Sequence, residues 1–79
     1  MNSLYSVLYD DGSGRGMGPS GQEVFHTRSS TPEAAIRKVM KHQGWKEIPN
    51  IAIDHLANGD LEYYYDGSTW TASVVKELP

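Results

Sequence analysis

Two hairpin signals enclose an aromatic strand in the segment NGDLEYYYDG, residues 58–67. Asn-Gly and Asp-Gly favour tight turns between antiparallel strands, because these residues tolerate the positive φ angles that such turns need. The segment therefore predicts three consecutive antiparallel strands. We expect Asn58-Gly59-Asp60 to form a three-residue loop and Asp66-Gly67 a two-residue loop.

Side-chain alternation predicts how these strands pair, because successive residues of a strand lie on opposite faces. With the loops above, His55 faces Tyr63, and Tyr63 faces Trp70. One face then collects apolar residues, namely Ile51, Ile53, Leu61, Tyr63, Tyr65, Trp70, Ala72 and Val74. The other face is mainly polar and carries Asp54, Leu56, Glu62, Tyr64, Thr69, Thr71 and Ser73. We expect the apolar face to be covered and the polar face to meet solvent.

The N-terminal third predicts a hairpin with a long tip. Strand-forming residues occupy 4–9 and 22–28, and the segment between them, residues 10–21, holds five of the eight glycines. Glycine at this density disfavours a helix or strand, because ordering it costs backbone entropy.

One helix is expected after the second strand. Either Thr31 caps it, with Pro32 at the first helical position, or Ser30 caps it in a capping box with Glu33. Ala35, Ile36, Val39 and Met40 form an apolar stripe at helical spacing, and Gly44 ends the helix. The order ββαβββ predicts an α+β fold: an antiparallel sheet of about five strands with one α-helix packed on one face.

Composition bounds the function classes. The chain has 79 residues, no cysteine and a net charge of -3. This length predicts a single domain, residues 1–79, with a thin core. No apolar run is long enough to span a membrane, and the start does not resemble a signal peptide, so we expect a cytoplasmic protein without a membrane partner. The acidic balance disfavours strong direct binding to nucleic acid.

The sequence predicts no catalytic, cofactor or metal site. GMGPSG, residues 16–21, has the letters of a dinucleotide-binding loop, but a strand follows where that motif needs a helix. His26, His42 and His55 lack metal-ligand spacing. Asp54 and His55 are strand neighbours, so their side chains point to opposite faces. We therefore expect a binding protein and not an enzyme.

Two surfaces are candidates for binding a partner. The polar sheet face offers Tyr64 as an aromatic anchor, since tyrosine buries area at low entropic cost. Acidic neighbours on this face or its turn favour encounter with a basic partner. This set comprises Tyr64, Asp54, Glu62, Asp66 and Thr71, and the glycine-rich tip adds Arg15 and Met17.

The layout resembles that of small phage-encoded anti-CRISPR proteins that inhibit type I systems. The matching parts are the helix of residues 30–40, the strand 51–56, the two turn dipeptides, the aromatic strand 61–65 and Trp70. The resemblance implies a stoichiometric inhibitor. We expect it to be a monomer or homodimer in the host cytoplasm. It implies binding to a host protein complex, namely a type I CRISPR effector (Cascade), and a block of target DNA binding or nuclease recruitment.

Two alternatives stay open. The first is a small nucleic-acid-binding module that uses a basic helix face and its neighbours, namely Arg28, Arg37, Lys38, Lys41 and Lys46. The second follows from the N-terminal half, where a strand, an acidic glycine-rich turn, another strand and the helix start TPEAA, residues 31–35, resemble HicB-type antitoxins.

Overall fold

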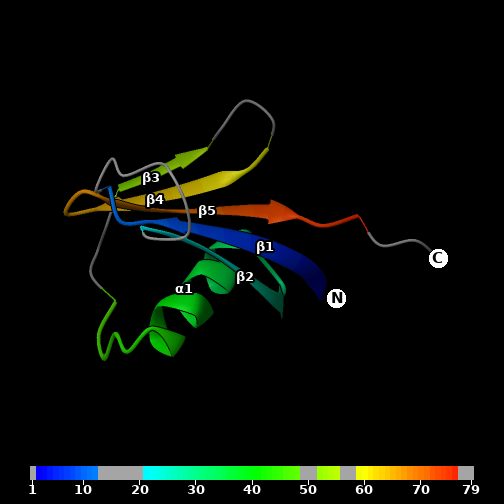
Figure 1. The fold of residues 1–79 in the computed structure, drawn as a ribbon. Coiled ribbons are helices and arrows are strands. Elements are labelled where there is room, and N and C mark those ends of the chain that lie inside the picture. The colour runs from blue at the N-terminus through cyan, green and yellow to red at the C-terminus, as the bar shows by residue number, and fades with distance from the viewer. Residues whose placement is uncertain (1, 13–20, 49–51, 56–58, 77–79) are drawn as a thin grey trace.

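The computed structural model describes residues 2–12, 21–48, 52–55 and 59–76. Its elements follow the order ββαβββ, as the sequence predicts (Figure 1). Their bounds are β1 Ser3–Asp10, β2 Gln22–Ser29, α1 Pro32–His42, β3 Ala52–His55, β4 Leu61–Tyr65 and β5 Ser68–Val74. No helix in these ranges is both long and apolar enough to cross a bilayer.

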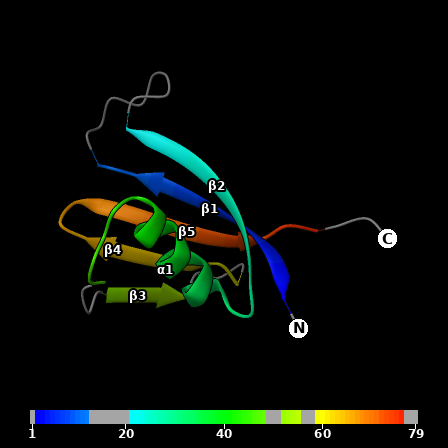
Figure 2. The same cartoon turned by 90° about the horizontal axis from the view of Figure 1, so that it is seen from below.

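The five strands form one antiparallel sheet in the order β2-β1-β5-β4-β3. The helix α1 covers one face of this sheet, and no other described helix or strand lies on the opposite face (Figures 1 and 2). The α+β fold with a single helix on an antiparallel sheet is thus confirmed. Strand β1 lies between β2 and β5, so the first strand joins the N-terminal hairpin to the last strand of the chain.

The register of the aromatic hairpins is confirmed in one pair and wrong in the other. Tyr63 pairs with Trp70, as expected. His55 pairs with Leu61 instead of Tyr63, which shifts β3 against β4 by two residues. This register does not fit the expected three-residue loop Asn58-Gly59-Asp60, which needs Ala57 opposite Leu61; residues 56–58 lie outside the described residues. A shift of two keeps the parity of every position, so side-chain alternation does not distinguish the two registers.

Both ends of α1 are capped. The Thr31 hydroxyl oxygen accepts a hydrogen bond from the Ala34 amide at 3.1 Å, which decides between the two expected N-caps. At the other end Gly44 has a φ of 102°. Its amide donates to the Lys41 carbonyl at 3.0 Å, and the Trp45 amide donates to the Met40 carbonyl at 3.1 Å. This pair of bonds is a Schellman motif, and it turns Trp45 back toward the core.

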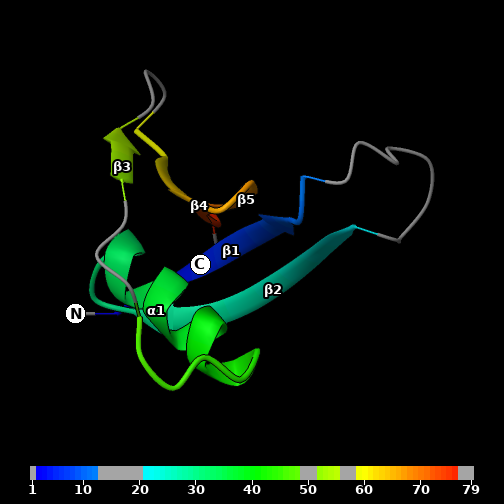
Figure 3. The ribbon, with the colours of Figure 1, turned by 90° about the vertical axis from the view of Figure 1, so that its left-hand side faces the viewer.

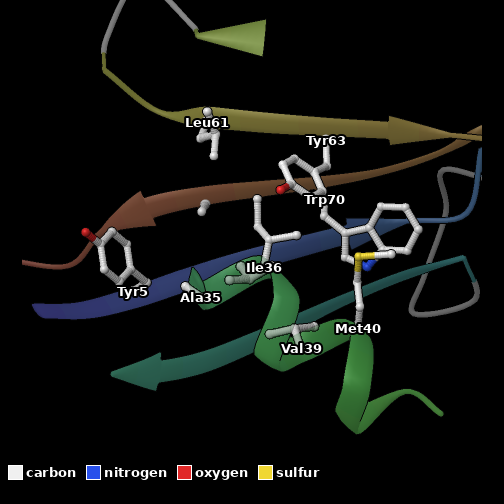
Figure 4. Close-up of a cluster of buried hydrophobic side chains, with 10 residues drawn as sticks. Tyr5, Ala35, Ile36, Val39, Met40, Leu61, Tyr63 and Trp70 are labelled. Atoms are coloured by element: carbon white, nitrogen blue, oxygen red, sulfur yellow. The ribbon is translucent and has the colours of Figure 1, made fainter. Parts of the chain in front are cut away.

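The core lies between α1 and the covered face of the sheet (Figure 4). The buried apolar residues are Tyr5, Val7, Ala35, Ile36, Val39, Met40, Leu61, Tyr63, Trp70 and Ala72. Two residues expected on this apolar face are not buried, since Tyr65 is 39% and Val74 is 59% exposed. Each is the last residue of its strand. The Trp45 ring packs edge-on against the Tyr65 ring, with ring centres 5.7 Å apart.

Two buried aromatics are tied to the helix by polar bonds. The Trp70 indole N–H donates to the Gln43 side-chain oxygen at 2.9 Å. The Tyr63 hydroxyl donates to Glu33 at 2.9 Å, and the same carboxylate oxygen accepts from Arg37 at 3.2 Å. Burial, helped by the bond to Glu33, raises the pKa of Tyr63 to about 12. The bonds from Tyr63 and then Arg37 lower the pKa of Glu33.

Candidate functional site

The uncovered face, meaning the sheet face opposite α1, carries a row of cross-strand partners that spans all five strands. Val24 pairs with Leu8, and Leu8 also pairs with Thr71 on its other side. Thr71 pairs with Glu62, and Glu62 with Asp54. We call these five positions the central row. Its residue types change from apolar at β2 and β1 to acidic at β4 and β3.

The apolar end of the central row is exposed. Leu8 is 38% exposed and Val24 is 54% exposed. Isolated apolar side chains are common on protein surfaces, but these two are direct cross-strand partners and so form one continuous patch. The patch provides apolar area that a docking partner would remove from water.

Tyr64 lies beside the central row and is 54% exposed. It pairs with Thr69 and Ala52, one row away from Glu62. Tyr64 and Glu62 are two residues apart on β4 and therefore share the uncovered face. The expected anchor is thus exposed next to a carboxylate.

The remaining sheet positions of the predicted site fall in different places. Thr71 is half-buried at the centre of the row. The backbone of Asp54 pairs with Glu62, while its side chain lies outside the described residues. Asp66 lies in the β4–β5 turn with a φ of 51°, at the end of the sheet and outside the central row. A further carboxylate, Asp60, accepts a hydrogen bond from the Ser73 hydroxyl at 2.8 Å.

The predicted tip residues Arg15 and Met17 lie outside the described residues. The base of the tip is held by hydrogen bonds to Asp10. Asp10 accepts hydrogen bonds from the Gln22 side chain at 3.0 Å and from the Gly12 amide at 2.8 Å. These two bonds, the one from Gln22 first, lower the pKa of Asp10. A Cβ at Gly12 would stand 2.0 Å from the Gly67 carbonyl oxygen, so the tip base is packed on the β4–β5 turn.

The predicted basic residues lie on α1, beyond its end and on β2. Arg37 pairs with Glu33 at 3.2 Å, and the Lys38 ammonium donates to the Arg28 carbonyl at 2.5 Å. Lys41 is exposed on α1, and Lys46 is exposed beyond its end. The Arg28 side chain follows the exposed alternation of β2, whose less exposed residues face the helix. Arg28 therefore points away from the basic face of α1.

The side chains of His26 and His42 belong to no potential metal-binding group in the described part of the chain, and that of His55 lies outside it. In the described part of the chain, no three His, Cys, Asp or Glu side chains lie where they could hold a metal ion. The His42 ring instead packs edge-on against Phe25, with ring centres 5.9 Å apart. The uncovered face offers contact area and hydrogen-bonding groups, which suit binding.

Sequence reasoning missed the Leu8–Val24 patch. Residues 4–9 carry apolar side chains at both even and odd positions, and this was the available signal. A strand that is apolar on both sides buries one face and exposes the other unless a second layer covers it.

No family model, no curated protein and no solved structure matches this chain.

Proposed function

We propose that the chain is a non-enzymatic binding protein that docks on a host protein complex with the uncovered face of its sheet. The observation that carries the proposal is the exposed set Leu8, Val24 and Tyr64 on a face that α1 does not cover. Buried aromatic and aliphatic anchors supply most of the binding free energy at protein interfaces. Glu62 beside Tyr64 adds a carboxylate that complements basic groups.

The partner class that we propose is a type I CRISPR effector complex in the host cytoplasm. The support for this class is the resemblance of the helix, turns and aromatic strand to phage-encoded inhibitors. Effector complexes that hold guide RNA carry many Lys and Arg side chains, and an acidic docking face complements such surfaces. The inhibitor, as a monomer or homodimer, would block target DNA binding or nuclease recruitment without turnover.

The test is target DNA binding by a purified type I effector complex in the presence of the protein. We expect inhibition that saturates at a fixed stoichiometry. Tyr64→Ala should weaken inhibition by about 5- to 30-fold, as loss of an interface anchor does. Tyr65→Ala is the matched control, because Tyr65 belongs to the covered face and should leave inhibition nearly unchanged.

Three outcomes would contradict the proposal. If Tyr64→Ala inhibits as well as the parent protein, the uncovered face is not the docking surface. If the parent binds duplex DNA or RNA tightly at physiological salt and Arg37→Glu with Lys41→Glu abolishes this, the nucleic-acid alternative replaces it. Direct phosphate binding would also weaken steeply with added salt. Neutralisation of a co-expressed partner toxin would favour the antitoxin alternative.

A further inference from the structure

Strand β2 forms one edge of the sheet, and its outer side faces no other described strand (Figures 2 and 3). It is eight residues long, Gln22–Ser29, and contains no proline. A free strand edge exposes backbone N–H and C=O groups that can pair with an added strand. Proteins often blunt such edges with proline or a bulge, and β2 pairs regularly with β1 along its length.

The backbone direction of each β2 residue follows from two hydrogen bonds. The Leu4 carbonyl accepts from the Val75 amide at 2.9 Å, so even-numbered residues of β1 direct their backbone groups toward β5. Odd-numbered residues of β1 then bond β2, through partners such as Tyr5 with Thr27. The even-numbered residues of β2 therefore face outward. The bond from the Lys38 ammonium to the Arg28 carbonyl agrees with this assignment independently.

Val24 and His26, in the middle of β2, are consequently two of the residues whose backbone groups are presented at the edge. Among the residues that the structure describes, neither has a backbone hydrogen-bond partner on this side. The Val24 side chain is exposed, and the His26 side chain is exposed as well. Four adjacent main-chain groups, two donors and two acceptors, thus match the spacing of a strand added antiparallel.

A groove of about 250 Å³ lies between this edge and α1. The β2 side is formed by Phe25, His26 and Thr27, and the helix side by Lys38, Val39 and His42. Phe25 and Val39 are apolar, and the His42 ring closes the end near Phe25. Lys38 lies at the other end, near Arg28. The groove thus has an apolar part at Phe25 and Val39 and a cationic part at Lys38.

We propose that β2 and α1 bind an extended segment of a partner protein by strand addition. The segment runs antiparallel to β2 and carries an acidic residue opposite Thr27 and an aliphatic residue opposite Phe25. Both side chains then point to the helix side, since alternate residues of a strand share a face. The carboxylate meets Lys38, and the aliphatic side chain fills the space between Phe25 and Val39. Backbone bonds give affinity, and the two side chains give specificity.

Charge favours such a segment over a second copy of this chain. Lys38 lines the groove, and none of its lining residues is acidic. Edge-to-edge pairing of two β2 strands would bring two α1 helices together, each with Lys38 and Lys41 exposed. Like charges in apposition oppose that dimer, whereas an acidic segment is complementary.

The experiment uses the whole protein and capped seven-residue threonine peptides with Asp at the third position and Leu at the fifth. Amide hydrogen exchange followed by NMR is the readout. We expect the Val24 and His26 amides to slow by about tenfold at nine-tenths saturation, because the added strand accepts their hydrogen bonds. The Phe25 and Thr27 amides, which already bond β1, should change little. A peptide with Ser in place of Leu should bind more weakly.

Charge reversal identifies the groove. Lys38→Glu should lower affinity for the Asp peptide by about threefold and raise it for a matching Lys peptide. Lys41→Glu makes the same change in net charge outside the groove and should not reverse the preference. Tyr64→Ala should leave peptide binding intact, so the edge site is tested separately from the uncovered face.

Three results would overturn the proposal. The first is unchanged exchange at Val24 and His26 with millimolar Asp–Leu peptide. The second is an equal shift of preference in Lys38→Glu and Lys41→Glu, which would place the peptide elsewhere. The third is protection of the two amides without peptide in a protein that sediments as a dimer, which would assign the edge to a second copy.

Discussion

Tyr63 and Tyr64 are neighbours in one strand and have opposite environments. Tyr63 is fully buried, with its hydroxyl bonded to Glu33 on α1. Tyr64 is 54% exposed on the side that α1 does not cover. Because both residues are tyrosines, their different exposure is due to the position of the helix alone. One residue type thus serves stability on one face and is available for binding on the other.

The same division extends across the sheet. Trp70, on the covered face, is 1% exposed and touches both Tyr9 and Trp45 with its ring. Thr69 and Thr71, its neighbours on β5, belong to the uncovered face and are half-buried. Substitutions on the covered face should therefore change the free energy of unfolding, while those on the uncovered face should change binding with little effect on stability.

The largest expected effect is at Trp70. Trp70→Ala should lower the free energy of unfolding by about 3–5 kcal/mol, because it removes the largest core side chain and leaves Gln43 without its indole donor. Thr71→Ala, one residue along, is the control and should cost less than about 1 kcal/mol. Urea unfolding measures both. Equal losses would break the division into a structural and a binding face.

A second prediction tests the end of the sheet, where the two turns meet. Gly12→Ala should destabilise by about 1–3 kcal/mol, since it adds a Cβ at positive φ and against the Gly67 carbonyl. Gly67→Ala is the control, because it also has a positive φ but has no atom within 4 Å of the added Cβ. Thermal unfolding should show the larger loss for Gly12→Ala. A larger loss of stability for Gly67→Ala would argue against the packing of the tip base on the β4–β5 turn.

A third prediction concerns the Tyr63 hydroxyl. Tyr63→Phe should cost about 1 kcal/mol at neutral pH, because the hydrogen bond to Glu33 is lost. The raised pKa of Tyr63, about 12 in the folded protein, gives stability that is full below the unfolded value of about 10 and is lost as pH rises toward 12.

The parent protein should therefore lose stability between pH about 10 and 12 more steeply than Tyr63→Phe. Unfolding in urea across this range measures the difference. Parallel curves for the two proteins would show that Tyr63 titrates normally and is not buried as described.

The smallest expected effect on stability is at Tyr64. Tyr64→Ala should change the free energy of unfolding by less than about 0.5–1 kcal/mol, because its side chain is more than half exposed and makes no described hydrogen bond. Urea unfolding is again the measurement. A loss as large as that of Trp70→Ala would mean that the register of β4 is shifted by one residue.

The order of elements and the division of β4 and β5 into two faces follow from local signals. Asp66-Gly67 fixes a two-residue turn, so the pairing of Tyr63 with Trp70 could be predicted from the sequence. Pro32 and the Ala35-to-Met40 stripe likewise predict where the helix begins and which side is buried. In the candidate site, Tyr64 was predictable for the same reason, since alternation places it opposite Tyr63.

The placement of distant segments was decided by tertiary structure. No local pattern states that β1 lies beside β5, yet this contact makes Leu8 a neighbour of Thr71 and joins the apolar and acidic halves of the central row. Likewise, pairing His55 with Leu61 or with Tyr63 places every side chain of β3 on the same face. Side-chain alternation therefore does not choose between the two registers, and the tertiary structure decides the pairing of His55. The β2–α1 groove exists because the chain folds α1 back beside an edge strand. Sequence periodicity assigns residues to faces, and only long-range packing decides which faces and edges meet.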